Sequence, residues 1–155
     1  MRIDALPHVD EHVTLIEAEP EDAWPHLVRV VETTFGRPGT GAYARLVSAA
    51  DPVASGPRPL AEGSTIPGFR VATAIPGREL TLRGRHRFST YALIFRLEQV
   101  GPGRSRLRAE TRAVFPGLAG GLYRQLLFRS GGHVLGVRRM LAAVRRQATA
   151  VDTTI

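Results

Sequence analysis

The stretch of sequence that decides the fold is residues 69–115, which read FRVATAIPGRELTLRGRHRFSTYALIFRLEQVGPGRSRLRAETRAVF. Apolar and polar residues alternate through most of this stretch, as they do in strands that bury one face. Turn-forming residues at 76–77, 89–90 and 101–103 separate the alternating runs. We therefore predict four strands, over residues 68–75, 78–88, 91–100 and 104–115. Their short links make the set an antiparallel meander.

The same alternation separates the two faces of the predicted sheet. One face is apolar and aromatic, with a single histidine, His86, among its side chains. The other face is a lattice of arginines with two glutamates, formed by Arg83, Arg85, Arg87, Arg96, Arg106, Arg108, Arg112, Glu98 and Glu110. Water covers one face of many antiparallel sheets while a helix covers the other, so we expect the apolar face to carry a helix.

Helices are predicted on both sides of the meander. Before it, the sequence predicts a strand over residues 12–18, a helix opened by residues 19–22, a short helix over residues 42–49, and a long loop over residues 51–67 with room for an edge strand at 58–61. After it, residues 118–148 predict one long helix. Its apolar stripe is Leu122, Leu126, His133, Val137, Met140, Leu141 and Val144. Gly131 and Gly132 interrupt this helix, where a bend or a wide turn is expected.

Length and composition limit the classes of protein. A chain of 155 residues is about one domain, so we predict a single domain over residues 1–155 with loose tails at 1–8 and 149–155. Cysteine is absent, which excludes disulfides, thiolate catalysis and cysteine zinc sites. The first residues contain no apolar signal-peptide core, and we expect a cytoplasmic location. The least polar stretch, residues 118–137, contains two arginines and a histidine and predicts no membrane span.

Charge is distributed unevenly along the chain. All 21 cationic residues are arginine, and most of them follow residue 62, where only four acidic residues remain. A basic surface of this kind attracts nucleic acid, anionic ligands or anionic membranes. The alternative is an ordinary solvated sheet face, which the interspersed glutamates and the absence of outward aromatic residues favour. We expect at most transient membrane contact, because the sheet should cover the apolar stripe of the last helix.

The order of one strand, two helices, a meander and a long C-terminal helix is the helix-grip order. At this level the chain resembles the START-like superfamily, also called SRPBCC, which includes the Bet v 1 plant allergens and the polyketide cyclases. The resemblance rests on residues 16–18 (IEA), 20–24 (PEDAW), 66–71 (IPGFRV), 84–89 (GRHRFS) and 121–123 (GLY), followed by His133 and Met140. The phrases at 66–71, 84–89 and 121–123 are similar to small bacterial members. The resemblance implies an α+β fold: a curved antiparallel sheet wrapped around the C-terminal helix, with an internal apolar cavity that binds lipids, polyketides or other hydrophobic molecules.

Two histidines are the sharpest candidates for chemistry. His86 on the strand face and His133 on the helix stripe could each orient a ligand carbonyl or act as a general acid or base. The alternative for each is a core histidine bonded to backbone or hydroxyl groups. Tyr91 and Tyr123 could supply phenolic donors, or they could simply pack. No third ligand of suitable type shares these faces, so we predict no metal site and no cofactor.

The ligand-binding residues that we predict are those expected to face the cavity: Trp24, Phe69, Leu82, His86, Phe88, Tyr91, Phe95, Thr111, Tyr123, Leu126, His133 and Val137. Binding of a small hydrophobic or amphipathic molecule is the function favoured by these residues. A cyclase- or dehydratase-like enzyme that uses the histidines and tyrosines is the alternative. A protein or nucleic-acid module that uses the arginine face is a further one. Either a monomer or a homodimer is compatible with the sequence.

Overall fold

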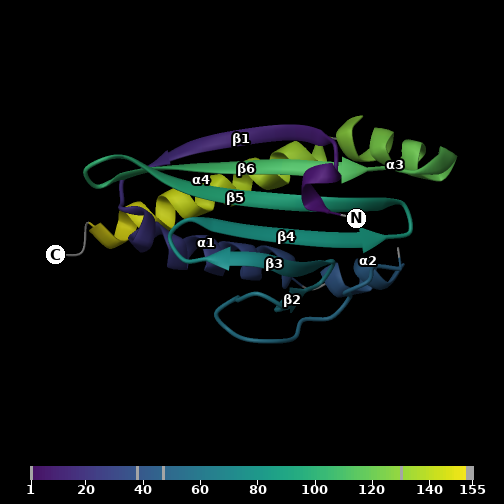
Figure 1. Cartoon of the computed structure of the whole chain (residues 1–155), viewed down its shortest axis with the longest axis horizontal. Helices are drawn as coiled ribbons and strands as arrows, with labels where there is room; N and C mark the ends of the chain where they lie inside the picture. Colours follow the sequence, from purple (N-terminus) through teal and green to yellow (C-terminus); the bar gives the residue numbers. More distant parts are fainter. Residues whose placement is uncertain (1, 38, 47, 130, 153–155) are drawn as a thin grey trace.

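The computed structural model of the chain describes residues 2–37, 39–46, 48–129 and 131–152 (Figure 1). Its elements are a 3-10 helix η1 (Ile3–Ala5), β1 (His8–Ile16), α1 (Pro20–Phe35), α2 (Thr40–Leu46), β2 (Thr65–Ile66), β3 (Phe69–Ile75), β4 (Glu79–His86), β5 (Ser89–Gly101), β6 (Arg104–Val114), α3 (Gly117–Arg129) and α4 (Gly132–Asp152). The predicted α+β helix-grip class is confirmed, with two helices after the first strand and a long C-terminal helix.

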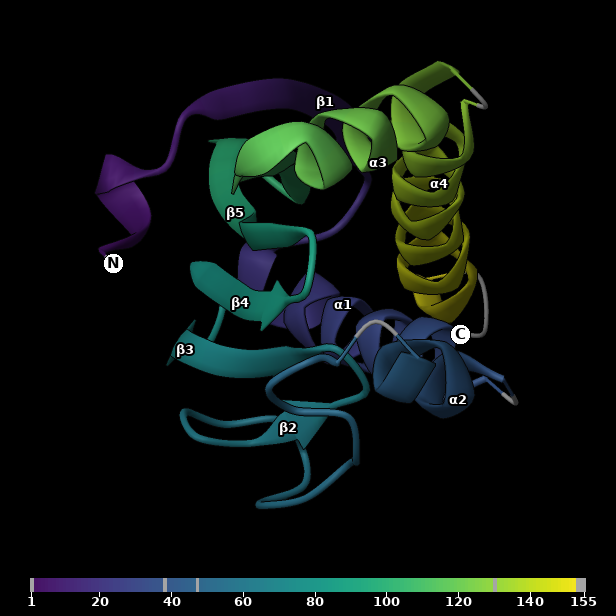
Figure 2. The same ribbon diagram turned by 90° about the vertical axis from the view of Figure 1, so that its right-hand side faces the viewer.

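The six strands form one antiparallel sheet in the order β1-β6-β5-β4-β3-β2. The first strand of the chain pairs with the last one, so the meander is extended by β1 at one edge and by the short β2 at the other. The helix α4 packs on α1 and β1 and lies along one face of the curved sheet (Figures 1 and 2). The core between them is built from fully buried side chains such as Phe95, Leu107 and Val144. Burial of this apolar face is the main force that holds helix and sheet together.

Alternation placed the strand faces correctly. Leu80 and Leu82 are buried, whereas Arg83 and Arg85 are exposed on the other face. One patch of the outer face is covered rather than wet, because Ala92 and Ile94 pack there against Leu6. Residues 3–6, predicted to belong to a loose tail, therefore form an ordered cover over the sheet. The predicted C-terminal tail is also partly helical, since α4 continues to Asp152, and residues 153–155 lie outside the described ranges.

Several element boundaries differ from the prediction. The strand β1 begins at His8, four residues early, with a register shift between His8 and Asp10. The β4–β5 turn is at residues 87–88, because His86 pairs with Ser89. The edge strand β2 lies at Thr65–Ile66 and not at 58–61. The start of the first strand was missed because its residues are mostly polar. The edge strand at 65–66 depends on a hairpin turn at Pro67-Gly68, in which Gly68 has a φ of +90°.

The predicted long helix is two helices. Gly131 has a φ of +70°, a left-handed conformation that glycine adopts without the steric cost of a side chain. The chain therefore turns sharply there, and α3 lies across the end of the sheet while α4 runs along it (Figure 2). Leu122 and Leu126, predicted to face the sheet, are instead exposed on α3, whereas Val137, Met140, Leu141 and Val144 are buried as expected. No helix in the described part of the chain is long and apolar enough to cross a membrane.

Candidate functional site

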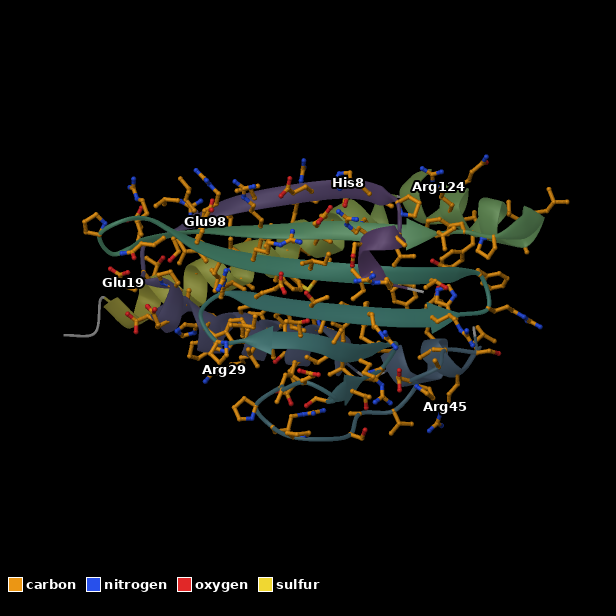
Figure 3. All side chains as sticks on the ribbon, viewed as in Figure 1. His8, Glu19, Arg29, Arg45, Glu98 and Arg124 are labelled. Carbon is orange, nitrogen blue, oxygen red and sulfur yellow. The ribbon has the colours of Figure 1, made fainter. Side chains whose placement is uncertain are left out.

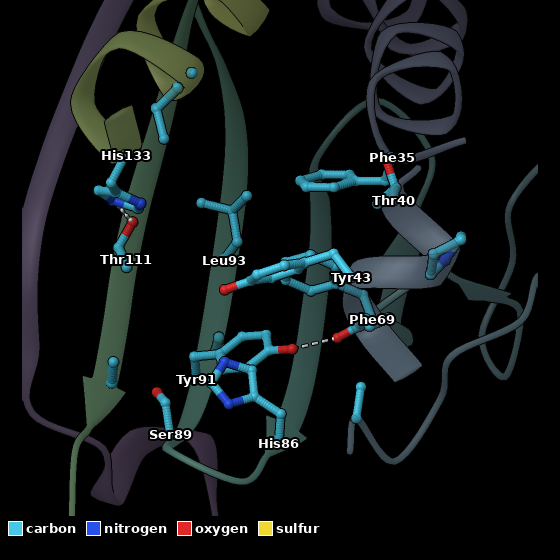
Figure 4. Close-up of a pocket in the computed structure, with 18 of the residues that line it drawn as sticks. Phe35, Thr40, Tyr43, Phe69, His86, Ser89, Tyr91, Leu93, Thr111 and His133 are labelled. Atoms are coloured by element: carbon cyan, nitrogen blue, oxygen red, sulfur yellow. Dashed lines mark hydrogen bonds between the residues drawn. The ribbon is translucent and has the colours of Figure 1, made fainter. Parts of the chain in front are cut away.

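A cavity of about 330 Å³ lies between the sheet and the helices α2, α3 and α4 (Figure 4). Its volume falls at the lower end of the range of small-molecule sites. Its walls are mainly apolar and include Phe35, Phe69, Leu93, Ala113, Phe115, Val137 and Met140. The polar side chains on the wall are Thr34, Thr40, Tyr43, His86, Ser89, Tyr91, Thr111, Tyr123 and His133. The site thus combines apolar volume with a few polar groups, as ligand sites do.

Small residues keep the cavity empty. Ala44 on α2, Ala113 on β6 and Gly136 on α4 all line it. A Cβ atom added at Gly136 would meet no heavy atom of a neighbouring residue within 4 Å, so this turn of α4 faces open volume. Val137, the next residue, and Met140, one turn further on, close the wall, and Val144 is fully buried in the core. The cavity therefore lies beside the N-terminal half of α4, whereas packed side chains fill the space beside its C-terminal half.

Tyr91 is held in place by two glycines. Its hydroxyl donates a hydrogen bond to the carbonyl oxygen of Gly68 at 2.6 Å. Tyr91 pairs with Gly84 across β4 and β5, and its ring crosses the space that a side chain at Gly84 would fill. Burial raises the pKa of Tyr91, so the phenol stays neutral. Because its proton is already engaged by Gly68, Tyr91 forms a rigid part of the cavity wall.

His86 presents a neutral imidazole to the cavity. The backbone N–H of Phe88 donates to its Nδ1 at 3.1 Å, so we assign the ring proton to Nε2. The ring packs between Tyr91 and Tyr123, with centroids 5.2 and 5.1 Å away (Figure 4 shows the contact with Tyr91). Burial lowers the pKa of His86. The side chain is therefore suited to donate one hydrogen bond, for example to a carbonyl oxygen of a ligand.

We expect His86 to make the stability of the protein depend on pH. The unfolded chain, whose histidine pKa is about 6.5, binds more protons than the folded chain between the lowered pKa and that value. The contribution of His86 to the free energy of unfolding is therefore fully present above about pH 6.5, and it is lost as the pH falls through the folded pKa. Thermal unfolding of the wild type and of His86→Gln between about pH 5 and pH 7.5 measures this. The wild type should lose more stability on acidification than the variant, and parallel profiles would contradict the assignment.

A pair of tyrosines joins α2 to α3 at the cavity. The hydroxyls of Tyr43 and Tyr123 lie 2.7 Å apart, although the residues are 80 positions apart in the chain. The ring of Tyr123 also stacks on Phe88, with centroids 5.4 Å apart. Burial raises the pKa of Tyr123, with a further contribution from its hydrogen bond with Tyr43, so it stays neutral. The pair ties two otherwise separate helices together at the border of the site.

At the side of the cavity formed by β6 and α4, His133 and a carboxylate form a polar group. His133 Nε2 lies 3.0 Å from Thr111 Oγ1 and 3.5 Å from Asp10 Oδ1, and Figure 4 shows the bond to Thr111. The other oxygen of Asp10 lies 3.3 Å from His12 Nε2. Asp10 Oδ1 is buried and accepts no hydrogen bond from the described residues. An imidazole backed by a carboxylate can move a proton, so this group has the parts of an acid–base pair.

Sequence reasoning missed Asp10 because the strand was predicted to begin at residue 12. The signal was present, since Asp10, His12, Thr14 and Ile16 alternate with period two and end in a fully buried residue. Asp10 pairs with Thr111 across β1 and β6, which brings the carboxylate to the inner face. On β5 and β6 the carboxylates of Glu98 and Glu110 lie on the outer face, as the alternation predicted, so the inward carboxylate comes from β1.

The predicted ligand-binding residues divide into two groups. Those on the cavity wall are Phe69, His86, Tyr91, Thr111, Tyr123, His133 and Val137. The others lie elsewhere: Trp24 packs against the core, Leu82 and Phe95 are inside it, Phe88 stacks behind Tyr123, and Leu126 faces solvent. The core residues are covered because α1 and the C-terminal half of α4 fill that part of the sheet. The prediction also lacked Phe35, Tyr43 and Gly136, whose place depends on how the helices dock.

The described residues contain no group of three or more His, Asp or Glu side chains arranged to hold a metal ion. The carboxylate of Asp10 lies between the imidazoles of His12 and His133, but these three side chains are not arranged as a metal site either.

Comparisons with known proteins give a likeness of fold alone. No protein-family model and no curated protein matches the chain. Among solved structures, the Zhui aromatase/cyclase from a Streptomyces species is 16% identical over 92% of this chain and 93% of that chain, with a TM-score of 0.56. A protein from Arthrobacter aurescens is 14% identical over 99% of this chain and 94% of its own, with a TM-score of 0.56. The Aha1 dimer from Colwellia psychrerythraea is 16% identical over 87% and 94%, with a TM-score of 0.52.

Proposed function

We propose that this protein binds a small, largely apolar molecule in the cavity between the sheet and α4. The observation that carries the proposal is an apolar-walled volume of about 330 Å³ that remains beside a tightly packed core. Leaving such volume unfilled forgoes stabilising contacts, so an unfilled cavity with polar groups on its wall points to a ligand. We also propose that the chain is a START-like protein, which the fold and the sequence phrases at 66–71 and 84–89 support.

The wall suggests what the ligand carries. Phe35, Phe69 and Tyr91 offer ring faces and edges in succession, with centroids 4.6 and 5.2 Å apart. Aromatic surfaces of this kind favour a flat or unsaturated ligand. At one side the Nε2–H of His86 is a donor, and at the other His133 and Thr111 offer a second polar point. A ring-containing molecule with a carbonyl or hydroxyl group fits this arrangement better than a plain hydrocarbon does.

Titration with a neutral naphthylamine fluorophore tests the proposal. The probe emits weakly in water and strongly in an apolar site, so we expect saturable, one-to-one enhancement with the purified protein. Competition by small aromatic ketones should displace the probe and rank the ligand chemistry. An absence of saturable binding across a panel of neutral apolar probes would leave the proposal without support.

A cyclase- or dehydratase-like enzyme is the second candidate, and the Asp10–His133 pair is the observation that favours it. In such a reaction His133 takes a proton from the carbon next to a ligand carbonyl, and the electron pair moves to the carbonyl oxygen. The Nε2–H of His86 is the donor available on the wall for that oxygen. Asp10 acts through His133 as a positioning residue, because it does not line the cavity.

The variant Asp10→Asn separates the two candidates. We expect it to leave probe affinity within about twofold, since Asp10 lies behind the wall. If the protein is an enzyme, the exchange of α-protons of an aromatic diketone, followed by NMR in deuterated buffer, should fall by about tenfold or more. The exchange rate of His133→Gln should fall as well, and the dependence of the exchange rate on pH should change in both variants. Wild-type exchange no faster than in imidazole buffer would remove the enzymatic candidate and leave ligand binding in place.

The arginine lattice supports a nucleic-acid site less strongly than the cavity supports a ligand site. Burial of Glu110 opposes its ionisation, but hydrogen bonds from His8 and Arg96 and the charge of Arg112 outweigh this and hold the pKa of that carboxyl below its usual range. Glu98 accepts from Arg106 at 2.6 Å. Much of the positive charge on β5 and β6 is therefore paired within the sheet itself.

A further inference from the structure

The helix α3 carries an apolar stripe that no part of the described chain covers. Leu118, Leu122 and Leu126 are 95%, 62% and 65% exposed. Their spacing of four residues places them on one side of the helix. The opposite side holds α3 to the domain, through the ring of Tyr123 and a close approach of Gly120 to the backbone at Phe115. Exposed apolar stripes of this kind are characteristic of a surface that contacts a partner.

The stripe belongs to the end of the molecule where the cavity lies. On α2, Leu46 is 76% exposed, and its neighbour Tyr43 both lines the cavity and bonds to Tyr123 of α3. Figure 2 looks directly at this end and shows α3 at the top and α2 at the lower right, with the start of α4 beside α3. The expectation that the sheet would cover the apolar stripe of the last helix fails for Leu122 and Leu126, because the chain turns at Gly131. Exposed apolar side chains from α2 and α3 therefore lie at this end of the molecule, although the leucines themselves do not line the cavity.

The same end is basic. Arg45 on α2 and Arg87 in the β4–β5 turn are exposed. Arg124 on α3 is exposed too, but it lies on the side of the helix away from the leucines, 6.0 Å from the centre of the Phe115 ring. The sequences of α2, the turn and α3 contain no Asp or Glu. Figure 3 shows Arg45 and Arg124 at this end, whereas Glu19 and Glu98 lie at the opposite end. A nearby carboxylate, that of Asp51, is already 3.0 Å from Arg70. The positive charge here is thus not compensated as it is on β5 and β6.

We propose that this docking face, formed by Leu46, Leu118, Leu122 and Leu126 with Arg45 and Arg87, binds the surface of an anionic membrane. The leucines would enter the boundary between headgroups and acyl chains, and the arginines would meet the lipid phosphates. A free phosphate would leave the leucines in water. A second copy of the chain would place uncompensated arginines against arginines. A bilayer accommodates both kinds of side chain at once.

Docking would let an apolar ligand pass between bilayer and cavity without crossing water. This step rests on the proposed function, whereas the docking itself rests on the surface alone. Two tests therefore stay separate: vesicle binding measures the docking face, and probe titration measures the cavity. A variant that fills the cavity, Gly136→Phe, should lose probe binding and still bind vesicles.

Co-sedimentation with lipid vesicles tests the proposal. We expect at least about tenfold stronger partitioning onto phosphatidylcholine vesicles containing phosphatidylglycerol than onto phosphatidylcholine alone, decreasing as salt is raised. Replacing both Leu122 and Leu126 with Gln should reduce it about tenfold or more. The double variant Arg45→Gln, Arg87→Gln should reduce binding to the anionic vesicles only. The matched controls are Leu15→Gln on β1 and Arg29→Gln on α1, exposed residues outside the docking face that should change nothing.

Three results would overturn the proposal. The first is equal binding, or none, on neutral and anionic vesicles. The second is unchanged partitioning of the leucine variant when its circular dichroism and thermal unfolding match those of the Leu15→Gln control. The third is a stable dimer in light scattering that becomes a monomer in the leucine variant, because the stripe would then be a subunit interface.

Discussion

Gly136→Phe should abolish binding of apolar probes, with a loss of about a hundredfold in affinity, in a chain that folds at least as stably as the wild type. Gly136 lies on the cavity wall, and a side chain added there meets no neighbouring heavy atom within 4 Å. The phenyl ring would therefore enter the cavity and occupy the volume that a ligand needs. Glycine inside a helix is destabilising by up to about 1 kcal/mol, so its replacement removes that cost.

The dissociation of binding from stability gives this experiment its force. Most variants that weaken binding also destabilise the fold, whereas Gly136→Phe should lose probe binding and keep its stability. Gly121→Phe on α3 is the matched control: it makes the same exchange at a helical glycine with open space but outside the cavity wall. Its probe affinity should stay within about twofold of the wild type. Calorimetry and probe titration of both variants provide the comparison, and full binding by Gly136→Phe would place the binding site elsewhere.

Gly84→Ala should lower the free energy of unfolding by about 3 kcal/mol, the upper part of the range for overpacked cores. The added Cβ would lie 2.2 Å from the carbonyl oxygen of Gly68 and 2.4 Å from a ring carbon of Tyr91. The structure cannot easily relax around the added Cβ, because the backbone of Gly68 lies on one side of it and the packed ring of Tyr91 on the other. The Tyr91–Gly68 hydrogen bond should break as the ring moves. For a chain of this size the midpoint of thermal unfolding should decrease by about 6–12 °C.

A second strand glycine controls for the effect of alanine itself. Gly101 ends β5 with no positive φ, and a Cβ added there meets nothing within 4 Å. Gly101→Ala should therefore be neutral or slightly stabilising in the same thermal scan. Probe affinity should fall in Gly84→Ala even at temperatures where the variant is folded, because Tyr91 is part of the wall. Equal stability of the two alanine variants would show that the ring and the hairpin carbonyl can move at little cost.

Alternation of side chains was enough to predict the sheet. In β4, Leu80 and Leu82 alternate with Glu79, Thr81 and Arg83, and a period of two that continues over a strand has one interpretation. The errors occurred where that period was weak or interrupted. The polar residues at positions 8–11 made the start of β1 look like a loose lead-in. Gly131 was recognised as a bend, but the left-handed turn that separates α3 from α4 depends on backbone conformation that residue type permits without requiring.

The candidate site was predictable in part for the same reason. The inward positions of His86, Tyr91 and Thr111 follow from strand alternation, which is a local property. Tyr43 and Asp10 could not be placed in this way, because their nearness to Tyr123 and His133 depends on how separate elements dock. A pairing of residues 80 or more positions apart has no local signal in one sequence.

The sequence by itself determined the helix-grip order, the apolar and basic faces of the sheet and the two histidines of the cavity. Each of these follows from periodicity, because a strand or a helix repeats its environment every few residues. Only the tertiary structure decided that an empty volume remains at Gly136, that Asp10 backs His133, and that the leucines of α3 face solvent. Those features depend on the distance and angle between packed elements, which are set by the whole core rather than by any one segment.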